Sequence, residues 1–193
     1  MEEKILNYYL DIDDETGVSR VSLVECPAVQ FDFLLFNEAI QFATNNEQKI
    51  VTGVVMLADV PILRIDPTRG KHYVTFTGET IKKIVLKYFK EMRTSSVNLE
   101  HSINIDGVYM FESYIIDRTR GINPPKEFAH IPDGSWIGSY KIENEEVWNS
   151  IKEGKFRGFS IEGYFNYNFS ENRAENAFYV DLYKLLNKVL INK

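Results

Sequence analysis

The sequence predicts an α+β domain that is rich in β-strands, most of them antiparallel. Of its 193 residues, 44% are hydrophobic and 13% aromatic, which is enough apolar surface for one buried core. Short apolar runs, several of them alternating with polar residues, recur between turn signals along the chain. Helical spacing is confined to a few segments. A single strand-rich domain with a small number of helices follows.

The N-terminal segment reads as two strands. Residues 4–12 form the first apolar run, and residues 13–17 (DDETG) are typical of a turn. Residues 18–24 then alternate apolar and polar side chains with period two. We expect the two runs to pair as a hairpin.

Further strands are predicted up to residue 76. Residues 31–36 form a short apolar strand, and residues 37–49 are polar and read as a connection. Residues 50–60 form a strand that Pro61 ends, because proline cannot donate to a β-ladder. Residues 72–76 resemble another strand.

The clearest predicted helix follows Thr77, whose hydroxyl can cap its first turn. Apolar residues recur there at helical spacing, namely Ile81, Ile84, Val85, Tyr88, Phe89 and Met92. Four lysines lie opposite them, at positions 82, 83, 87 and 90. We interpret the lysines as a solvated face.

The second half of the chain alternates strands and connections. Residues 108–116 and 135–142 are strands, and residues 117–134 between them are a long connection of the kind that is often functional. A short helix is expected from Asn144 to Gly154, and residues 156–169 form one long strand. An amphipathic helix over residues 174–190 ends the chain.

Composition argues against several classes of protein. The single cysteine, Cys26, excludes an internal disulfide, and the three histidines show no zinc spacing, so we expect no metal and no cofactor. The net charge of −6 is spread along the chain without a basic stripe, so no nucleic-acid partner is expected. The acidic N-terminus lacks the pattern of a signal peptide, and no apolar run is long enough to span a membrane.

Several single residues receive ordinary structural interpretations. Trp136 and Trp148 are expected to anchor the core, and Cys26 to be buried as a small hydrophobic residue. His72 and His130 are expected to be exposed.

One serine and one histidine stand out as candidates for chemistry. Ser160 lies in GFSIEG at residues 158–163, and His101 ends VNLEH at residues 97–101. An imidazole can take the hydroxyl proton as the oxygen attacks a carbonyl, so the two are the minimum parts for acyl transfer. Gly158 and Gly163 lack side chains and are expected to let a substrate strand approach closely.

Further blocks surround this pair. They are VSLVECPAV at residues 21–29, GVYMFES at 107–113, WIGSYKI at 136–142, EEVW at 145–148 and IKEG at 151–154. Together with NLEH and GFSIEG, their order and spacing resemble those of the prohead (capsid maturation) serine proteases of tailed bacteriophages. The likeness covers roughly residues 5–165.

The resemblance implies a fold similar to the herpesvirus assemblin proteases, a β-barrel surrounded by helices. It implies Ser160 as the nucleophile and His101 as its general base. Residues 1–170 would be the protease domain, and residues 171–193 a packed extension or a docking tail.

The third member of a triad stays open. Glu162 is two residues from Ser160, so the two share a strand face and could contact the same imidazole. Glu100 precedes His101 and would point to the opposite face. Glu175 and Asp181 lie downstream of Ser160, where the herpesvirus third residue falls, but within or near a predicted helix.

The resemblance also implies partners and a location. The substrates would be the scaffold protein and the major capsid protein, with self-cleavage and a homodimer as further expectations. The place of action would be the host cytoplasm, inside the assembling procapsid. The alternatives are a catalytically inactive scaffold or capsid-assembly protein on the same fold, and a different hydrolase or transferase that uses Ser160.

Overall fold

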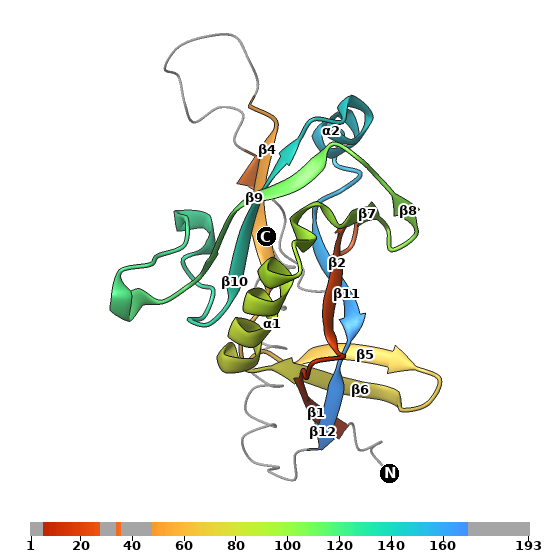
Figure 1. Cartoon of the computed structure of the whole chain (residues 1–193), viewed down its shortest axis with the longest axis vertical. Helices are drawn as coiled ribbons and strands as arrows, with labels where there is room; N and C mark the ends of the chain where they lie inside the picture. Colours follow the sequence, from red (N-terminus) through yellow and green to blue (C-terminus); the bar gives the residue numbers. More distant parts are fainter. Residues whose placement is uncertain (1–5, 28–33, 36–47, 170–193) are drawn as a thin grey trace, which may run out of the picture.

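The computed structural model describes residues 6–27, 34–35 and 48–169. The expected C-terminal helix and the proposed boundary at residue 170 lie outside these residues. Within them the chain is mostly β-strand, with two α-helices (Figure 1). The pairs β1–β6 and β2–β7 are parallel and the other ladders are antiparallel. The expected α+β class with mostly antiparallel strands is confirmed.

The strands form three four-stranded sheets. The first has the order β12 (Asn166–Phe169), β1 (Leu6–Asp11), β6 (Gly70–Phe76) and β5 (Ile62–Asp66). The second has the order β3 (Leu34–Leu35), β4 (Ile50–Met56), β10 (Trp136–Ile142) and β9 (Val108–Ile115). The third, called the site sheet below, has the order β11 (Gly158–Tyr164), β2 (Gly17–Val24), β7 (Val97–Leu99) and β8 (Ile103–Asn104).

The expected β-barrel is not formed by the described strands. A barrel needs a continuous ring of strand pairs, whereas here each sheet has two ends. In Figure 1 the site sheet stands between the other two sheets.

The expected N-terminal hairpin is wrong for a related reason. β1 and β2 do not pair with each other, because each pairs with a strand near the C-terminal end of the described chain, β1 with β12 and β2 with β11. Tyr8 lies opposite Phe169 in the first sheet, and Gly17 lies opposite Tyr164 in the site sheet. The turn at residues 13–16 therefore lets the chain pass from one sheet to the next.

The long strand expected at residues 156–169 is divided for the same reason. It breaks at Phe165, where the chain leaves the site sheet and enters the first sheet as β12. The register of β11 on β2 also shifts between Glu162 and Gly163. Such a bulge twists the strand locally and redirects the side chains beside it.

Helix α1 (Gly78–Lys90) begins as predicted, with Thr77 Oγ1 accepting a hydrogen bond from the Thr80 N–H at 3.1 Å. It packs through Tyr88 onto Trp136 of β10, with ring centroids 5.2 Å apart. The lysine face is only partly solvated, because Lys87 Nζ donates to the carbonyls of Asp13, Asp14 and Thr16. Lys87 thus holds the β1–β2 turn against α1.

Helix α2 (Glu145–Lys152) also matches the prediction. Asn144 Oδ1 accepts hydrogen bonds from the N–H groups of Glu146 and Val147, both at 3.1 Å. Trp148 faces the core and is fully buried. Trp136 is likewise fully buried, so both tryptophans anchor the core as expected.

One large hydrophobic cluster joins strands of all three sheets to both helices. A smaller cluster lies under the connection at residues 117–134 and includes Phe128 and Ile131. In that connection Arg118 pairs with Asp133 and donates to the carbonyls of Ala129 and Ile131. The connection is therefore packed, with short 3₁₀ turns, where the sequence suggested a structureless loop.

Two of the single-residue expectations are wrong. Cys26 is exposed, and His72 is buried at 1% exposure because its ring packs edge-on against Tyr8. His130 is exposed as expected. Among the described helices, none is both long and apolar enough to cross a membrane.

Candidate active site

The site sheet brings three polar residues side by side. Ser22 of β2 lies opposite Ser160 of β11 on one side and beside Asn98 of β7 on the other. Because side chains alternate along a strand, the neighbours Val21 and Leu23 face the hydrophobic core instead. One face of the sheet is thus polar near its centre.

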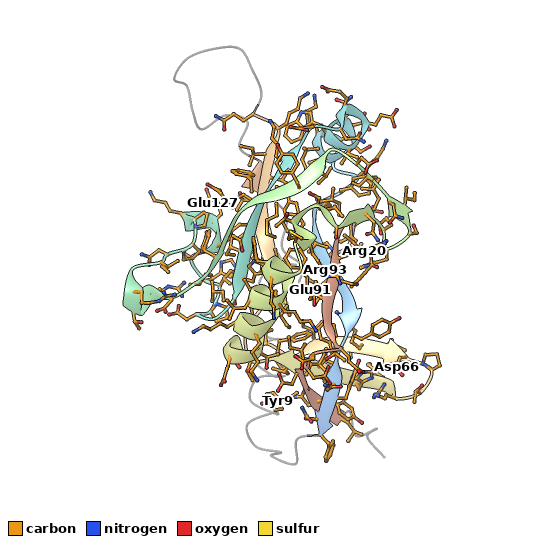
Figure 2. All side chains as sticks on the ribbon, viewed as in Figure 1. Tyr9, Arg20, Asp66, Glu91, Arg93 and Glu127 are labelled. Carbon is orange, nitrogen blue, oxygen red and sulfur yellow. The ribbon has the colours of Figure 1, made fainter. Side chains whose placement is uncertain are left out.

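This polar face continues toward the end of the sheet. Arg20 of β2, labelled in Figure 2, donates to Asn104 of β8 at 2.5 Å. Glu162 lies opposite Arg20 in the register of β11 on β2. Glu162 therefore shares this face with Ser160, as the two-residue spacing predicts.

His101 lies just after β7, in a tight turn. Glu100 and His101 both adopt positive φ, 48° and 58°. Non-glycine residues rarely adopt this conformation, and it clusters at functional sites. The turn is closed by the Ser102 N–H, which donates to the Leu99 carbonyl at 3.0 Å. It brings the imidazole back to Ser22 and Glu162.

Four side chains meet in one hydrogen-bonded group. A single oxygen of Glu162, Oε1, lies 2.8 Å from Ser22 Oγ, 2.5 Å from Asn98 Nδ2 and 3.1 Å from His101 Nδ1. Ser22 Oγ also lies 2.6 Å from Asn98 Oδ1 and 2.9 Å from His101 Nδ1. The side chains come from β2, β7, the following turn and β11.

The group combines a buried part with an open part. Ser22 and Asn98 are 0% and 1% exposed, whereas the side chains of Glu162 and His101 are 27% and 42% exposed. Burial alone would raise the pKa of Glu162, but the hydrogen bonds from Asn98, Ser22 and His101 together hold that pKa below its ordinary value. Glu162 is therefore an anion at neutral pH.

An ionised carboxylate only accepts hydrogen bonds, so the contact with Glu162 places the imidazole proton on Nδ1. The contacts of His101 with described residues all use Nδ1. In the neutral imidazole, Nε2 then carries no proton and can accept one. This is the arrangement of an imidazole base that a carboxylate orients.

Ser160 lies beside this group without joining it directly. The residue is 7% exposed, and within the described chain its hydroxyl makes no hydrogen bond to His101. Cross-strand neighbours such as Ser160 and Ser22 have Cβ atoms roughly 5 Å apart. Catalytic hydrogen bonds are often long before substrate binds, so the missing contact between Ser160 and His101 is compatible with a role for Ser160.

The other acidic candidates separate clearly from Glu162. Glu100 is turned away from the imidazole, and its Oε1 accepts a hydrogen bond from the Glu25 N–H at 2.6 Å. Glu175 and Asp181 lie outside the described residues. Ser22 and Asn98 were not singled out from the sequence, because strand register alone reveals their position beside Ser160.

An open groove runs along β11 and reaches this group at Glu162. Its volume is about 440 Å³, within the range of ligand-binding clefts. Its walls carry both polar and aromatic residues, among them Arg64, Phe76, Glu162, Tyr164 and Tyr167. A smaller, mostly apolar pocket reaches Ser160 and shares Arg64, Phe76 and Ile161 with the groove.

Gly163 allows two strands of the site sheet to approach each other closely. A Cβ atom at this position would lie 2.1 Å from the carbonyl oxygen of Gly17 on β2. The missing side chain therefore allows β11 and β2 to approach at the bulge, while a close approach of substrate at Gly163 stays a prediction.

No group of three or more His, Cys, Asp or Glu side chains suited to a metal ion is found in the described ranges. The side chains that meet at the site are instead a carboxylate, an imidazole, an amide and the Ser22 hydroxyl, with Ser160 on the neighbouring strand. On an α+β scaffold, this set is typical of hydrolases that use an activated serine.

The chain belongs to the family described as "Putative phage serine protease XkdF", whose model matches residues 39–168. The resemblance to phage serine proteases is thereby confirmed at the level of the family.

Two proteins of Bacillus subtilis (strain 168) are similar to this chain. "Phage-like element PBSX protein XkdF" is 28% identical over 182 residues, which cover 86% of this chain and 59% of that protein. "Uncharacterized protein YqbD" is 26% identical over 156 residues, covering 76% of this chain and 44% of that protein. The chain thus spans about half the length of these relatives. No solved structure matches it.

Proposed function

We propose that the chain is a serine endopeptidase with Ser160 as nucleophile, His101 as general base and Glu162 as the carboxylate that orients the base. The contact of 3.1 Å between Glu162 Oε1 and His101 Nδ1, on the sheet face that also carries Ser160, is the main support. Membership in a family described as phage serine proteases agrees with this chemistry.

In the proposed reaction, Ser160 Oγ attacks the carbonyl carbon of the scissile peptide bond while its proton passes to His101 Nε2. The resulting imidazolium is stabilised by Glu162, which keeps its negative charge. When the C–N bond breaks, the same proton goes to the leaving amine. Water then hydrolyses the acyl-serine, with His101 again taking and returning a proton.

The substrate would bind in the groove along β11. This strand ends the site sheet, so its outer edge forms no ladder with another described strand, although residues 55–57 at the end of β4 lie beside it near Ser160. An extended peptide can add to such an edge through main-chain hydrogen bonds. The groove along residues 161–165 and the smaller pocket at Ser160 support an extended peptide as the substrate class.

We further propose that the natural substrates are the scaffold protein and the major capsid protein, cut inside the assembling procapsid in the host cytoplasm. Self-cleavage and a homodimer belong to the same proposal, as does a distant relation to the assemblin fold. The supports are the phage family and the order of the sequence blocks around Ser160 and His101.

The alternative function is a catalytically inactive capsid-assembly protein on the same scaffold. One observation favours it, namely that His101 contacts Ser22 directly while Ser160 makes no direct contact with the imidazole. Ser22 is fully buried, so a substrate carbonyl cannot reach its hydroxyl.

The test is intact mass spectrometry of the wild-type protein beside Ser160→Ala, each incubated with a candidate scaffold protein. Truncation products in the wild type and their absence in Ser160→Ala establish the serine protease. Ser139→Ala is the matched control. Ser139 is also a buried strand serine, but it lies in the second sheet, where its hydroxyl hydrogen-bonds to that of Thr52. Equal cleavage by Ser160→Ala and the wild type would refute the assignment of Ser160.

A further inference from the structure

We infer that Ser22 and Asn98 are positioning residues that lock Glu162 against His101 and thereby keep the imidazole proton on Nδ1. The inference rests on the proposed function and deepens it. Ser22 and Asn98 lie on strands next to each other in the site sheet, and neither touches a substrate in the proposed reaction.

Asn98 fixes the carboxylate. Its Nδ2 donates to Glu162 Oε1 at 2.5 Å, while its Oδ1 lies 2.6 Å from Ser22 Oγ. The amide is therefore held at both ends and is 1% exposed, so it has little freedom to turn. A glutamate side chain loses considerable rotamer freedom when it is fixed, and the rigid amide supplies the contact that fixes it.

Ser22 joins the carboxylate to the imidazole. A hydroxyl has one proton and two lone pairs. The Ser22 proton lies between two acceptors, Glu162 Oε1 at 2.8 Å and Asn98 Oδ1 at 2.6 Å. The lone pairs face His101 Nδ1 at 2.9 Å and can accept its N–H. The Nδ1 proton thus meets two oxygens, one from Glu162 and one from Ser22.

Two properties of the sheet make these partners necessary for Glu162. β11 is the end strand of the site sheet, and the register shift occurs directly after Glu162. A carboxylate on an end strand beside a bulge is open to water, which would compete for its oxygens. Ser22 and Asn98 are fully buried and approach from the protected side.

The experiment reads the imidazole directly. Four proteins are labelled with ¹⁵N-histidine: the wild type, Ser22→Ala, Asn98→Ala and the control Ser139→Ala. The tautomer of His101 is determined by NMR at about pH 8, where an ordinary imidazole is neutral. The wild type and Ser139→Ala are expected to carry the proton on Nδ1. In Ser22→Ala and Asn98→Ala the proton is expected mainly on Nε2. Ser22→Thr keeps the hydroxyl and should restore the wild-type tautomer.

Cleavage of a peptide that depends on Ser160 is measured alongside. Ser22→Ala and Asn98→Ala are expected to lower kcat about 10²-fold with little change in KM, because misplaced catalytic groups slow the chemical step. An unchanged Nδ1 tautomer in both variants overturns the inference, and so does a changed tautomer with undiminished cleavage. If either variant does not fold, the other gives the answer.

The two proposals fail in different ways. A changed tautomer in a protein that cleaves no peptide in a Ser160-dependent manner supports the positioning of the imidazole and refutes the protease. An unchanged tautomer together with Ser160-dependent cleavage refutes the positioning role and leaves the protease intact.

Discussion

Glu162 gathers its partners from distant parts of the chain. The residues that hydrogen-bond to its Oε1 lie between 61 and 140 positions away in the sequence. The carboxylate is therefore oriented only when β2, β7 and β11 are paired. Correct geometry at this residue reports the folding of the whole site sheet.

The first prediction concerns acid stability at Glu162. Its pKa is lowered in the folded protein, so the unfolded chain binds the proton more readily as the pH falls. The stabilisation is fully present above the ordinary glutamate pKa of about 4.3 and is lost as the pH falls through the folded value. Glu162→Gln should therefore flatten the rise in the free energy of unfolding with pH in the range below about 4.3, as measured by urea denaturation.

The same substitution also tests the chemistry. Converting the orienting carboxylate of a serine triad to an amide can lower kcat by about 10⁴-fold, because the imidazole adopts the wrong tautomer. Glu153→Gln is the control, since Glu153 is an exposed glutamate that pairs with Lys155 at the end of α2. Cleavage by Glu162→Gln at the wild-type rate would exclude Glu162 from the reaction.

At the residue level, period-two alternation was enough to place Ser160 and Glu162 on one face. It could not reveal Ser22 and Asn98, since their role depends on which strands are neighbours and in which register. The backbone of His101 was also beyond prediction, because positive φ at a histidine depends on the tertiary structure around the turn.

At the level of elements, Lys87 links α1 to the turn that separates β1 from β2. Its ammonium group donates to three backbone carbonyls, at 2.9, 2.6 and 2.7 Å. Its side chain is only 20% exposed. The turn therefore depends on a helix that is far from it in the sequence.

The second prediction follows from this contact. Lys87→Met keeps most of the apolar stem but removes the three charge-assisted hydrogen bonds, and should lower the free energy of unfolding by about 2 kcal/mol. Lys82→Met, on the exposed face of the same helix, should change it by less than about 0.5 kcal/mol. Urea denaturation compares the two variants, and equal effects would mean that the carbonyls of the turn are satisfied without Lys87.

Both described helices and most strands could be predicted, because their signals are local caps and periodicities. The pairing of the strands was less accessible. β5 was not predicted, and its residues 62–66 become a strand by pairing with β6. The hairpin of β1 and β2 failed because the turn signal at residues 13–17 is compatible with either pairing, and the C-terminal chain supplies both partners.

At the level of the whole molecule, the main core extends through all three sheets. Residues from each sheet and from both helices belong to one hydrophobic cluster. The absence of a closed barrel in the described chain therefore does not divide the core. The α+β class depends on composition and periodicity and could be predicted, whereas barrel closure was implied by the family resemblance alone.

The third prediction is that the described region unfolds in one cooperative step. Trp136 and Trp148 are both fully buried in the main cluster, one on β10 and one on α2. Tryptophan fluorescence and far-UV circular dichroism should therefore follow the same urea transition. A fluorescence transition at a lower urea concentration than the circular dichroism transition would show that the second sheet and α2 unfold separately from the rest.

Because β2 lies between β11 and β7, it determines where a recombinant fragment of this chain can begin. The family match begins at residue 39, after β1 and β2 have ended. A recombinant fragment trimmed to that match would lack Ser22, and it would lack the strand that joins β11 to β7. Ser160 on β11 and His101 in the turn after β7 would both be present in such a fragment, but without the strand that lies between β11 and β7. Expression boundaries for this family are therefore better drawn from strand pairing, starting before Leu6, than from the limits of sequence similarity.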